Sequence, residues 1–283
     1  MIQFLFVFLA LELSSFTTLR NFRPIITPNV FRSAALDELS QTEAQILYDS
    51  LRSGLILDLR NQDEMEKSQS KATEGSQWFY DELQVSHTLT RIHLPILQSV
   101  DEFWDVTISY MPLWTRVTAT AQTIVQAGAL DRAAARYLES QGLFGLYRSM
   151  LESGGPAFNQ GLHICLQSKG PVLVHCQKGK DRTGLLSMML QHCAGATREE
   201  IIEAYSLSEQ LLGPDRQQIR AGNSNNDYID WNLFRGSPAQ AMIDTLDWMD
   251  CRYGSIDGYL DSIGFNAEHR EAWKNKCARY RSR

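Results

Sequence analysis

One stretch of the chain, residues 175–184, combines a cysteine, an arginine and two glycines at spacings suited to chemistry on an anion. It overlaps the end of a short apolar run, residues 170–175, and leads into a helical pattern. A loop that leaves a strand and enters a helix directs backbone N–H groups, and the positive end of the helix dipole, at one place. The sequence therefore predicts a phosphate-sized anion site, where Gly179 and Gly184 let the backbone approach the ligand closely.

The residue types within this loop suggest nucleophilic catalysis. Cys176 stands where positive potential favours the thiolate, which is the nucleophilic form of a cysteine. Arg182 offers a planar fork of donors that can hold two phosphate oxygens and stabilise their charge in the transition state. Asp181 is placed to protonate the leaving oxygen and then to activate water. Thr183 is placed to donate a hydrogen bond to the departing thiolate.

The other loop residues are expected to bind phosphate or to support the loop. The predicted phosphate-binding residues are Gln177, Lys178, Gly179, Lys180, Thr183 and Gly184. The charges of Lys178 and Lys180 suit a substrate with a second phosphate or an acidic flank. His175 is expected to orient the loop through hydrogen bonds. Asp58, at the end of an earlier strand, is the alternative to Asp181 as the general acid, although a supporting structural role fits it better.

Composition and charge narrow the classes of partner. The chain has 283 residues and a formal net charge of −6, so it lacks the basic excess with which nucleic-acid-binding proteins neutralise phosphates. Its five cysteines include no C-x-x-C pair, which argues against a disulfide framework and a zinc site. We expect no metal, no cofactor and no nucleic-acid partner, and a reducing, cytoplasmic setting. Cys165 and Cys193 are expected in the core, with a protective disulfide to Cys176 as the alternative.

The first 18 residues form an apolar N-terminal extension. Residues 2–11 are almost wholly apolar, as in a weak signal-like segment, but no Lys or Arg precedes them and Glu12 interrupts the run. The run is also shorter than the roughly 20 residues that a membrane-spanning helix needs. We expect residues 1–18 to pack on the domain without stable membrane insertion. Secretion, or association with a membrane through this segment, is the alternative.

The order of patterns predicts an α/β fold with a mostly parallel sheet flanked by helices. A helix over residues 37–52 precedes a strand over residues 54–59. Residues 91–96 should form an edge strand, because a proline there removes a ladder donor. Residues 61–77 are rich in Gln, Glu, Ser and Lys without apolar periodicity, and are expected to form a solvated loop.

The second half of the chain is mostly helical in pattern. Helices over residues 106–167 are inserted before the strand at residues 170–175, and are a candidate lid. A capping box at residues 197–200 opens a later helix. Start and stop signals predict the remaining helices over residues 183–193, 237–254 and 255–264, and from residue 266 towards the C-terminus.

The loop resembles the signature of the protein tyrosine phosphatase superfamily, which is His-Cys, five residues, Arg and Ser/Thr. His175, Cys176, Arg182 and Thr183 match it. The run at residues 179–184 is similar to that of the atypical tyrosine phosphatases of bacteria and fungi. Further segments that look like this family make the resemblance extend over about residues 19 to 280, namely residues 21–23, 31–34, 57–60, 253–255 and 259–260.

This resemblance implies a cysteine-phosphatase fold in a single phosphatase domain over residues 19–283. It implies hydrolysis of phosphotyrosine in proteins, with phosphoserine and phosphothreonine as further substrates, through a phosphocysteine intermediate. In that family an aspartate of the loop, here Asp181, is the general acid, and the Trp-Pro-Asp motif of ordinary tyrosine phosphatases is absent from this sequence.

Three alternatives stay open. Gln177 and Lys178 replace the small residues usual in the family, and Lys178 with Lys180 is similar to the two-lysine loops of the phosphatase and tensin homologue group, so a phosphoinositide is the alternative substrate. A silent phosphopeptide-binding module usually has a changed nucleophile or arginine, whereas Cys176 and Arg182 are intact. A rhodanese-like sulfurtransferase fits less well with the Lys-Asp-Arg-Thr-Gly run and the helix after it.

Overall fold

The computed structural model describes residues 16–25, 29–213 and 228–281. In this part of the chain, five strands form one sheet in the order β1-β2-β5-β3-β4. The first pairing is antiparallel and the other three are parallel, which confirms the predicted α/β fold with a mostly parallel sheet. The strands are β1 (Arg23–Pro24), β2 (Val30–Ser33), β3 (Leu55–Asp58), β4 (Thr90–His93) and β5 (Val172–His175).

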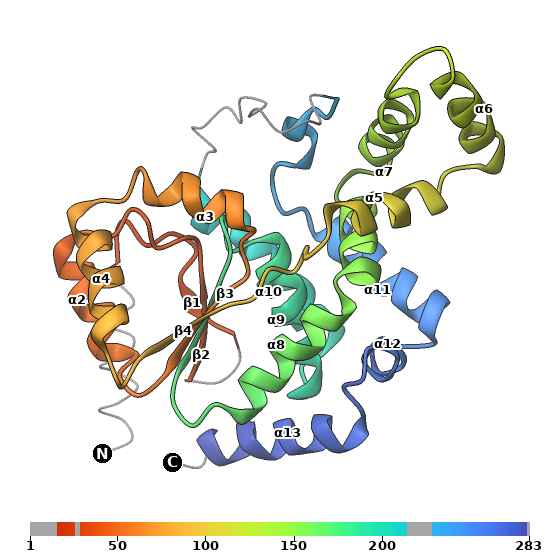
Figure 1. Cartoon of the computed structure of the whole chain (residues 1–283). Coiled ribbons are helices and arrows are strands. Elements are labelled where there is room, and N and C mark those ends of the chain that lie inside the picture. Colours follow the sequence, from red (N-terminus) through yellow and green to blue (C-terminus); the bar gives the residue numbers. More distant parts are fainter. Residues whose placement is uncertain (1–15, 26–28, 214–227, 282–283) are drawn as a thin grey trace.

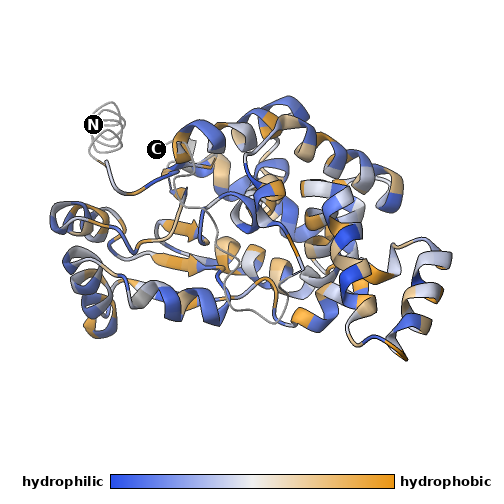
Figure 2. Ribbon diagram, turned by 90° about the horizontal axis from the view of Figure 1, so that it is seen from above, coloured by the Kyte–Doolittle hydropathy of each residue, from blue (hydrophilic) through white to orange (hydrophobic). Residues whose placement is uncertain are grey.

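Helices cover both faces of this sheet. Figure 1 shows α2 (Gln41–Ser50) and α4 (Glu74–Val85) on one face, and α8 (Gly155–Gln167) and α9 (Asp181–Cys193) on the other. The central strand β5 is therefore buried along its whole length, as its continuous apolar sequence predicts. Figure 2 shows the apolar strands between the two helical layers, with hydrophilic residues on the outer sides of the helices. Strand β4 lies at an edge, as predicted.

Three inserted helices separate β4 from α8. They are α5 (Val100–Ser109), α6 (Leu113–Thr123) and α7 (Ala129–Ser153). In Figure 1, α6 projects from the upper right of the molecule, away from the sheet. Their expected function as a lid stays a prediction.

The remaining helices follow the signals in the sequence. Thr197 Oγ1 accepts a hydrogen bond from Glu200 N at 3.2 Å, and the Glu200 carboxylate accepts one from Thr197 N at 2.8 Å, which confirms the capping box. Gly254, with φ +80°, ends a helix at the predicted residue. The elements are α10 (Arg198–Leu212), the 3-10 helix η1 (Trp231–Phe234), α11 (Ala239–Tyr253), α12 (Ile256–Ser262) and α13 (Ala267–Arg281).

The prediction of a solvated loop over residues 61–77 is wrong. This segment holds α3 (Gln62–Gln69) and the beginning of α4. Asn61 N donates to the Glu64 carboxylate at 2.9 Å at the start of α3, and the Thr73 hydroxyl accepts a hydrogen bond from Ser76 N at the start of α4. Caps and tertiary contacts stabilise these helices, so they form although their sequences lack apolar periodicity.

The predicted N-terminal extension lies mostly outside the described residues. Of residues 1–18, only Phe16, Thr17 and Thr18 are described. Thr18 N donates to Glu43 Oε1 at 2.8 Å, and the Phe16 ring packs edge-on against Phe22 at 4.8 Å. Among the helices within the described ranges, none combines the length and the apolar character needed to cross a bilayer.

Candidate active site

Side chains from the N-terminal segment hold the backbone of the loop that follows β5. The Asn21 side-chain amide donates to the carbonyls of Lys178 and Gly179 at 3.1 and 2.9 Å. Arg32, on β2, donates to the Gly179 carbonyl at 2.7 Å. Since the carbonyl and the N–H of one peptide unit point in opposite directions, these outward carbonyls turn the next N–H groups towards the hollow of the loop. The loop therefore has the backbone orientation of an anion cradle.

Helix α9 begins directly at the end of this loop, at Asp181. The first N–H groups of a helix have no partner within it, and the positive end of the helix dipole lies there. Gly179 makes the tight approach possible: its φ is +62°, and a Cβ atom at this position would lie 2.0 Å from the Ser33 carbonyl oxygen. Only glycine fits there without moving β2.

The predicted nucleophile, Cys176, is the first residue after β5 and is only 2% exposed. Its thiol is free, as are those of the other four cysteines. Cys165 and Cys193 lie in the core, and burial raises the pKa of each to about 12. Both are therefore protonated thiols at neutral pH, and neither is in a disulfide with Cys176.

Arg182, on the first turn of α9, is held by Glu64 of α3. Its Nη1 and Nη2 donate to the two carboxylate oxygens at 2.5 and 2.7 Å, and Nη1 also donates to the Leu59 carbonyl at 3.4 Å. Burial alone would raise the pKa of Glu64, but the charge and hydrogen bonds of Arg182 outweigh burial and lower it. Of the five guanidinium hydrogens, Nε–H and one on Nη2 stay available for a second bidentate contact, such as one with phosphate.

Asp181 is the first residue of α9, and one of its carboxylate oxygens is engaged. Tyr147 Oη donates to Asp181 Oδ1 at 2.6 Å, and Lys180 Nζ lies 3.3 Å from the same oxygen. The side chain keeps 22% of its surface exposed. The predicted general acid thus lies within the loop, buried on one side and open on the other.

The two lysines of the loop border the same hollow, but the ammonium group of Lys180 is engaged within the protein, which differs from the expectation. Lys180 is buried, and its ammonium group donates to the carbonyls of Phe234 and Gly236 at 2.9 and 2.6 Å. It ties the loop to the end of η1 and to the residues after it, and is not directed at a second phosphate. Lys178 is half-buried and borders an open hollow of about 610 Å³, whose other charged lining residues are Arg20, Lys180, Glu209 and Arg235.

Asp58 and His175 lie side by side at the carboxyl ends of β3 and β5. Asp58 accepts hydrogen bonds from Arg60 Nη2 at 2.8 Å and from Arg91 Nη2 at 2.5 Å. Burial raises its pKa, but the charge that His175 carries when protonated, together with Arg60 and Arg91, holds the pKa of Asp58 well below the usual range. Asp58 is therefore an ion-paired carboxylate and is surrounded by cations.

The orienting hydrogen bond expected of His175 is not found among the described residues. Neither ring nitrogen has a hydrogen-bond partner there, and Nε2 lies 3.6 Å from Asp58 Oδ2. Burial lowers the pKa of His175 to about 4, so the ring is neutral at pH 7. The residue contributes instead through its backbone, because its carbonyl accepts a hydrogen bond from Leu59 N at 2.8 Å.

The remaining predicted residues also lie in the loop. Gln177 is exposed, and its side chain accepts a hydrogen bond from Ser68 at 3.3 Å. The Thr183 hydroxyl is buried and has no partner among the described residues, and its bond to the thiolate stays a prediction. A Cβ atom on Gly184 would lie 3.4 Å from the Tyr205 ring, so glycine leaves room for that ring.

Sequence reasoning missed several residues that shape this site. Asn21 and Arg32 lie in segments that resemble the family, but nothing in their spacing predicts that they bind the loop backbone. The polar composition around Glu64 predicts a solvated surface, and the helical spacing of Tyr147 predicts a position in the core. Their contacts with Arg182 and Asp181 arise from tertiary packing of α3 and α7, which the sequence pattern does not encode.

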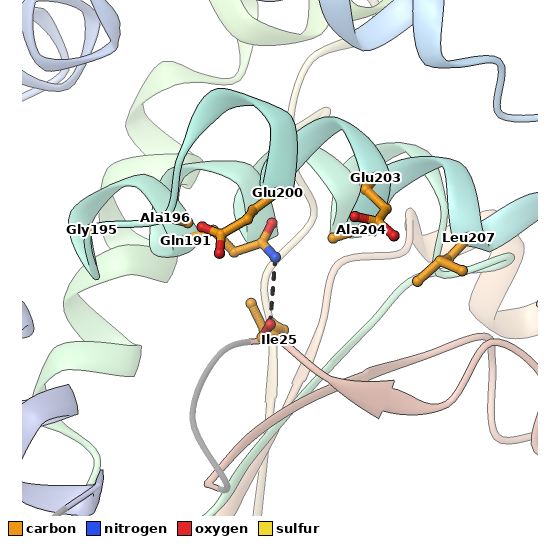
Figure 3. Close-up of a pocket in the computed structure, with 8 residues that line it drawn as sticks. All are labelled: Ile25, Gln191, Gly195, Ala196, Glu200, Glu203, Ala204 and Leu207. Carbon is orange, nitrogen blue, oxygen red and sulfur yellow. Dashed lines mark hydrogen bonds between the residues drawn. The ribbon is translucent and has the colours of Figure 1, made fainter.

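A second hollow, of about 450 Å³, is lined by Ile25 and by residues near the end of α9 and on α10 (Figure 3). Gln191 donates to the Ile25 carbonyl at 3.4 Å across it, and Glu200 and Glu203 lie on its rim. None of the residues that line it belongs to the loop at residues 175–184. The two carboxylates would repel a phosphate, so this hollow does not suit a phosphate ester.

Two comparisons with known proteins bear on the family of this chain. A curated tyrosine-protein phosphatase from Nostoc commune is 30% identical over 139 residues, which is 45% of this chain and 46% of that protein. The chain thus aligns with less than half of that relative's length. The model of the tyrosine phosphatase family matches residues 13–279, which include the loop, the sheet and the helices around it. Because that match extends over nearly the whole chain, this chain belongs to the tyrosine phosphatase family.

Proposed function

We propose that this chain hydrolyses phosphate monoesters with Cys176 as the nucleophile, and that its main substrate is phosphotyrosine in proteins, with phosphoserine and phosphothreonine as further substrates. The observation that carries the proposal is the backbone of the loop between Cys176 and Arg182. The carbonyls of Lys178 and Gly179 accept hydrogen bonds from Asn21 and Arg32, an arrangement that favours inward-facing N–H groups in the loop.

The first chemical step forms a phosphorus–sulfur bond. The Cys176 thiolate attacks phosphorus, the ester P–O bond breaks, and Asp181 gives its proton to the leaving oxygen. In the second step water attacks the phosphocysteine, Asp181 takes up a proton from that water, and the P–S bond breaks. The products are phosphate and the thiolate, which Thr183 is placed to stabilise with its hydroxyl.

Arg182 and the backbone stabilise the transition state. The Arg182 hydrogens that Glu64 and Leu59 leave available, on Nε and Nη2, form a fork that matches two phosphate oxygens. Since these donors are fixed before the substrate binds, little reorganisation is needed as charge develops on the phosphoryl oxygens.

The position of Lys180 favours a phosphoprotein over a phosphoinositide. The phosphoinositide alternative rests on two loop lysines, and Lys180 donates to the carbonyls of Phe234 and Gly236. Lys178 borders the open hollow with Arg20, where an acidic segment beside a phosphotyrosine would be accommodated. A reducing, cytoplasmic setting is part of this proposal, because the nucleophile is lost when its thiol is oxidised.

The decisive experiment measures release of phosphate from para-nitrophenyl phosphate without added metal. The wild type is expected to turn over, and Cys176→Ser is expected to keep its fold and less than about 1% of the rate, because no other nucleophile replaces the thiolate. A Cys176→Ser variant with a near-normal rate overturns the mechanism. A wild type that binds phosphopeptide without turnover would be a binding module.

The substrate class needs a direct comparison. The kcat/KM on a phosphotyrosine peptide, with and without acidic flanking residues, is compared with that on a panel of short-chain phosphoinositides. A higher value on the peptides supports the proposal, whereas a preference for a lipid headgroup with several phosphates supports the alternative.

A further inference from the structure

Two buried tyrosines from distant helices form a chain of hydroxyl groups that ends on Asp181. Tyr147, on α7, donates to Asp181 Oδ1 at 2.6 Å, and its oxygen lies 2.6 Å from the hydroxyl oxygen of Tyr205, on α10. The two rings pack edge to face, with centroids 6.0 Å apart. Both side chains are at most 2% exposed, so neither hydroxyl exchanges its partner for bulk water.

The direction of the hydrogen bonds follows from the chemistry of the groups. Burial, together with the charge of Asp181, raises the pKa of both tyrosines well above the usual value, so both stay neutral hydroxyls. An ionised carboxylate only accepts hydrogen bonds, so the single proton of Tyr147 goes to Asp181. Tyr205 must then donate its own proton to the Tyr147 oxygen.

The hydrogen bonds through the two tyrosines also decide which oxygen of Asp181 carries the proton in the acid form. A proton on Oδ1 would reverse their direction: Tyr147 would donate to Tyr205, and the Tyr205 proton would then have no acceptor among the described residues. A proton on Oδ2 leaves both hydrogen bonds intact. Lys180 Nζ, 3.3 Å from Oδ1, also disfavours a proton on that oxygen.

The Tyr147 hydroxyl also keeps the Asp181 carboxylate from bonding to the start of its own helix. An aspartate at the start of a helix, as Asp181 is in α9, is attracted to the unpaired N–H groups of that helix, which the proposed function assigns to phosphate binding. If Asp181 bonded to them it would occupy the cradle and lose its reach to the leaving oxygen. The bond from Tyr147 holds Oδ1 on the buried side of the loop.

We propose that Tyr147, aligned by Tyr205, is a positioning residue that holds Oδ1 of Asp181 and presents the transferable proton on Oδ2 to the leaving oxygen. This inference rests on the proposed phosphatase function. It assigns to α7 and α10 a direct part in protonation of the leaving group, separate from their packing.

The test compares two esters and a double-mutant cycle. The kcat values for phenyl phosphate, a poor leaving group, and for 2,4-dinitrophenyl phosphate, an activated one, are measured for the wild type, Tyr147→Phe, Tyr205→Phe, Asp181→Asn and the Tyr147→Phe/Asp181→Asn double variant. Tyr259→Phe is the matched control, because Tyr259 is equally buried and its hydroxyl donates to the Leu151 carbonyl at 2.8 Å, outside the site. Thermal unfolding shows which variants fold.

We expect Tyr147→Phe to lower kcat on phenyl phosphate about tenfold or more and to change kcat on the activated ester less than about twofold, since an acid matters most for a poor leaving group. Tyr205→Phe should give the same pattern with a smaller effect, and it tests the inference even if Tyr147→Phe does not fold. In the Asp181→Asn background, Tyr147→Phe should not lower kcat any further.

Any one of three results overturns the inference while the phosphatase function stands. Tyr147→Phe slows both esters equally, it lowers kcat by the same factor in the Asp181→Asn background as in the wild type, or Tyr259→Phe shows the same pattern. A folded wild type that hydrolyses neither ester overturns the function and the inference together.

Discussion

Glu64 accepts two hydrogen bonds from Arg182, at 2.5 Å from Nη1 and 2.7 Å from Nη2, so a residue of α3 fixes the guanidinium group at the start of α9. The pair is largely buried, with side-chain exposures of 11% for Arg182 and 31% for Glu64. A buried arginine keeps its orientation only while its donors are satisfied. Glu64 therefore fixes the orientation of the Arg182 guanidinium group, which the proposed mechanism requires before a substrate binds.

Glu64→Gln should lower kcat/KM on para-nitrophenyl phosphate about tenfold, because the amide offers one acceptor oxygen and no charge to the arginine. Asp63→Asn is the control, since it removes the same charge from an exposed neighbour on α3. Steady-state kinetics of both variants check this. Equal rates for Glu64→Gln and the wild type would show that Arg182 needs no partner.

Arg182→Lys should cost at least about 2 kcal/mol of transition-state stabilisation, because a planar fork becomes a point charge. The measured quantity is the ratio of kcat/KM values, converted to a free energy. Vanadate binding serves as a second readout, because vanadate mimics the transition state. A near-normal rate for this variant removes Arg182 from the site.

Asp181→Asn and Asp58→Asn should differ in kind. Asp181→Asn is expected to slow a phenyl ester far more than an activated ester and to flatten the basic limb of the pH profile. Asp58→Asn is expected to slow all esters alike and to destabilise the fold by about 3 kcal/mol, since it leaves Arg60 and Arg91 without their shared carboxylate. Leaving-group dependence in Asp58→Asn alone would assign the acid to β3.

Gly179→Ala should abolish most of the activity, because its Cβ atom would lie 2.0 Å from the Ser33 carbonyl oxygen. Gly195→Ala is a matched control: Gly195 also has a positive φ, of +88°, but a Cβ atom there meets nothing within 4 Å. Each variant should lose about 1 kcal/mol from backbone strain. Only Gly179→Ala should lose turnover, and an active Gly179→Ala would show that the loop is not tightly held against β2.

His175 should make the stability depend on pH between about 4 and 6.5. Burial lowers its pKa from 6.5 to about 4 in the folded chain, so between these values the unfolded chain binds more protons. The contribution of neutral His175 to the free energy of unfolding is complete above about pH 6.5. It is lost as the pH falls towards 4, by up to about 3 kcal/mol. Urea unfolding at several pH values should show a weaker dependence in His175→Gln. The control, His87→Gln, changes an exposed histidine and should behave as the wild type.

The sequence determined the loop and the elements on either side of it. A continuous apolar run followed by glycine and a helical pattern admits few local structures, so β5, the turn at Gly179 and α9 could be predicted from local rules. The capping box at Thr197 and the glycine end at Gly254 are equally local, because each depends on residues within one turn of the helix.

Tertiary structure decided the partners of the predicted residues. Glu64 lies 118 positions from Arg182, and Tyr147 lies 34 from Asp181. The polar composition of α3 hid both its helical state and its contact with the site. Lys180 is a further example. Its place in the loop suggests contact with a substrate, but the carbonyls of Phe234 and Gly236 accept its hydrogen bonds. A local pattern determines the backbone position from which a side chain extends. The packing of distant elements decides which charged group or hydroxyl becomes its hydrogen-bond partner.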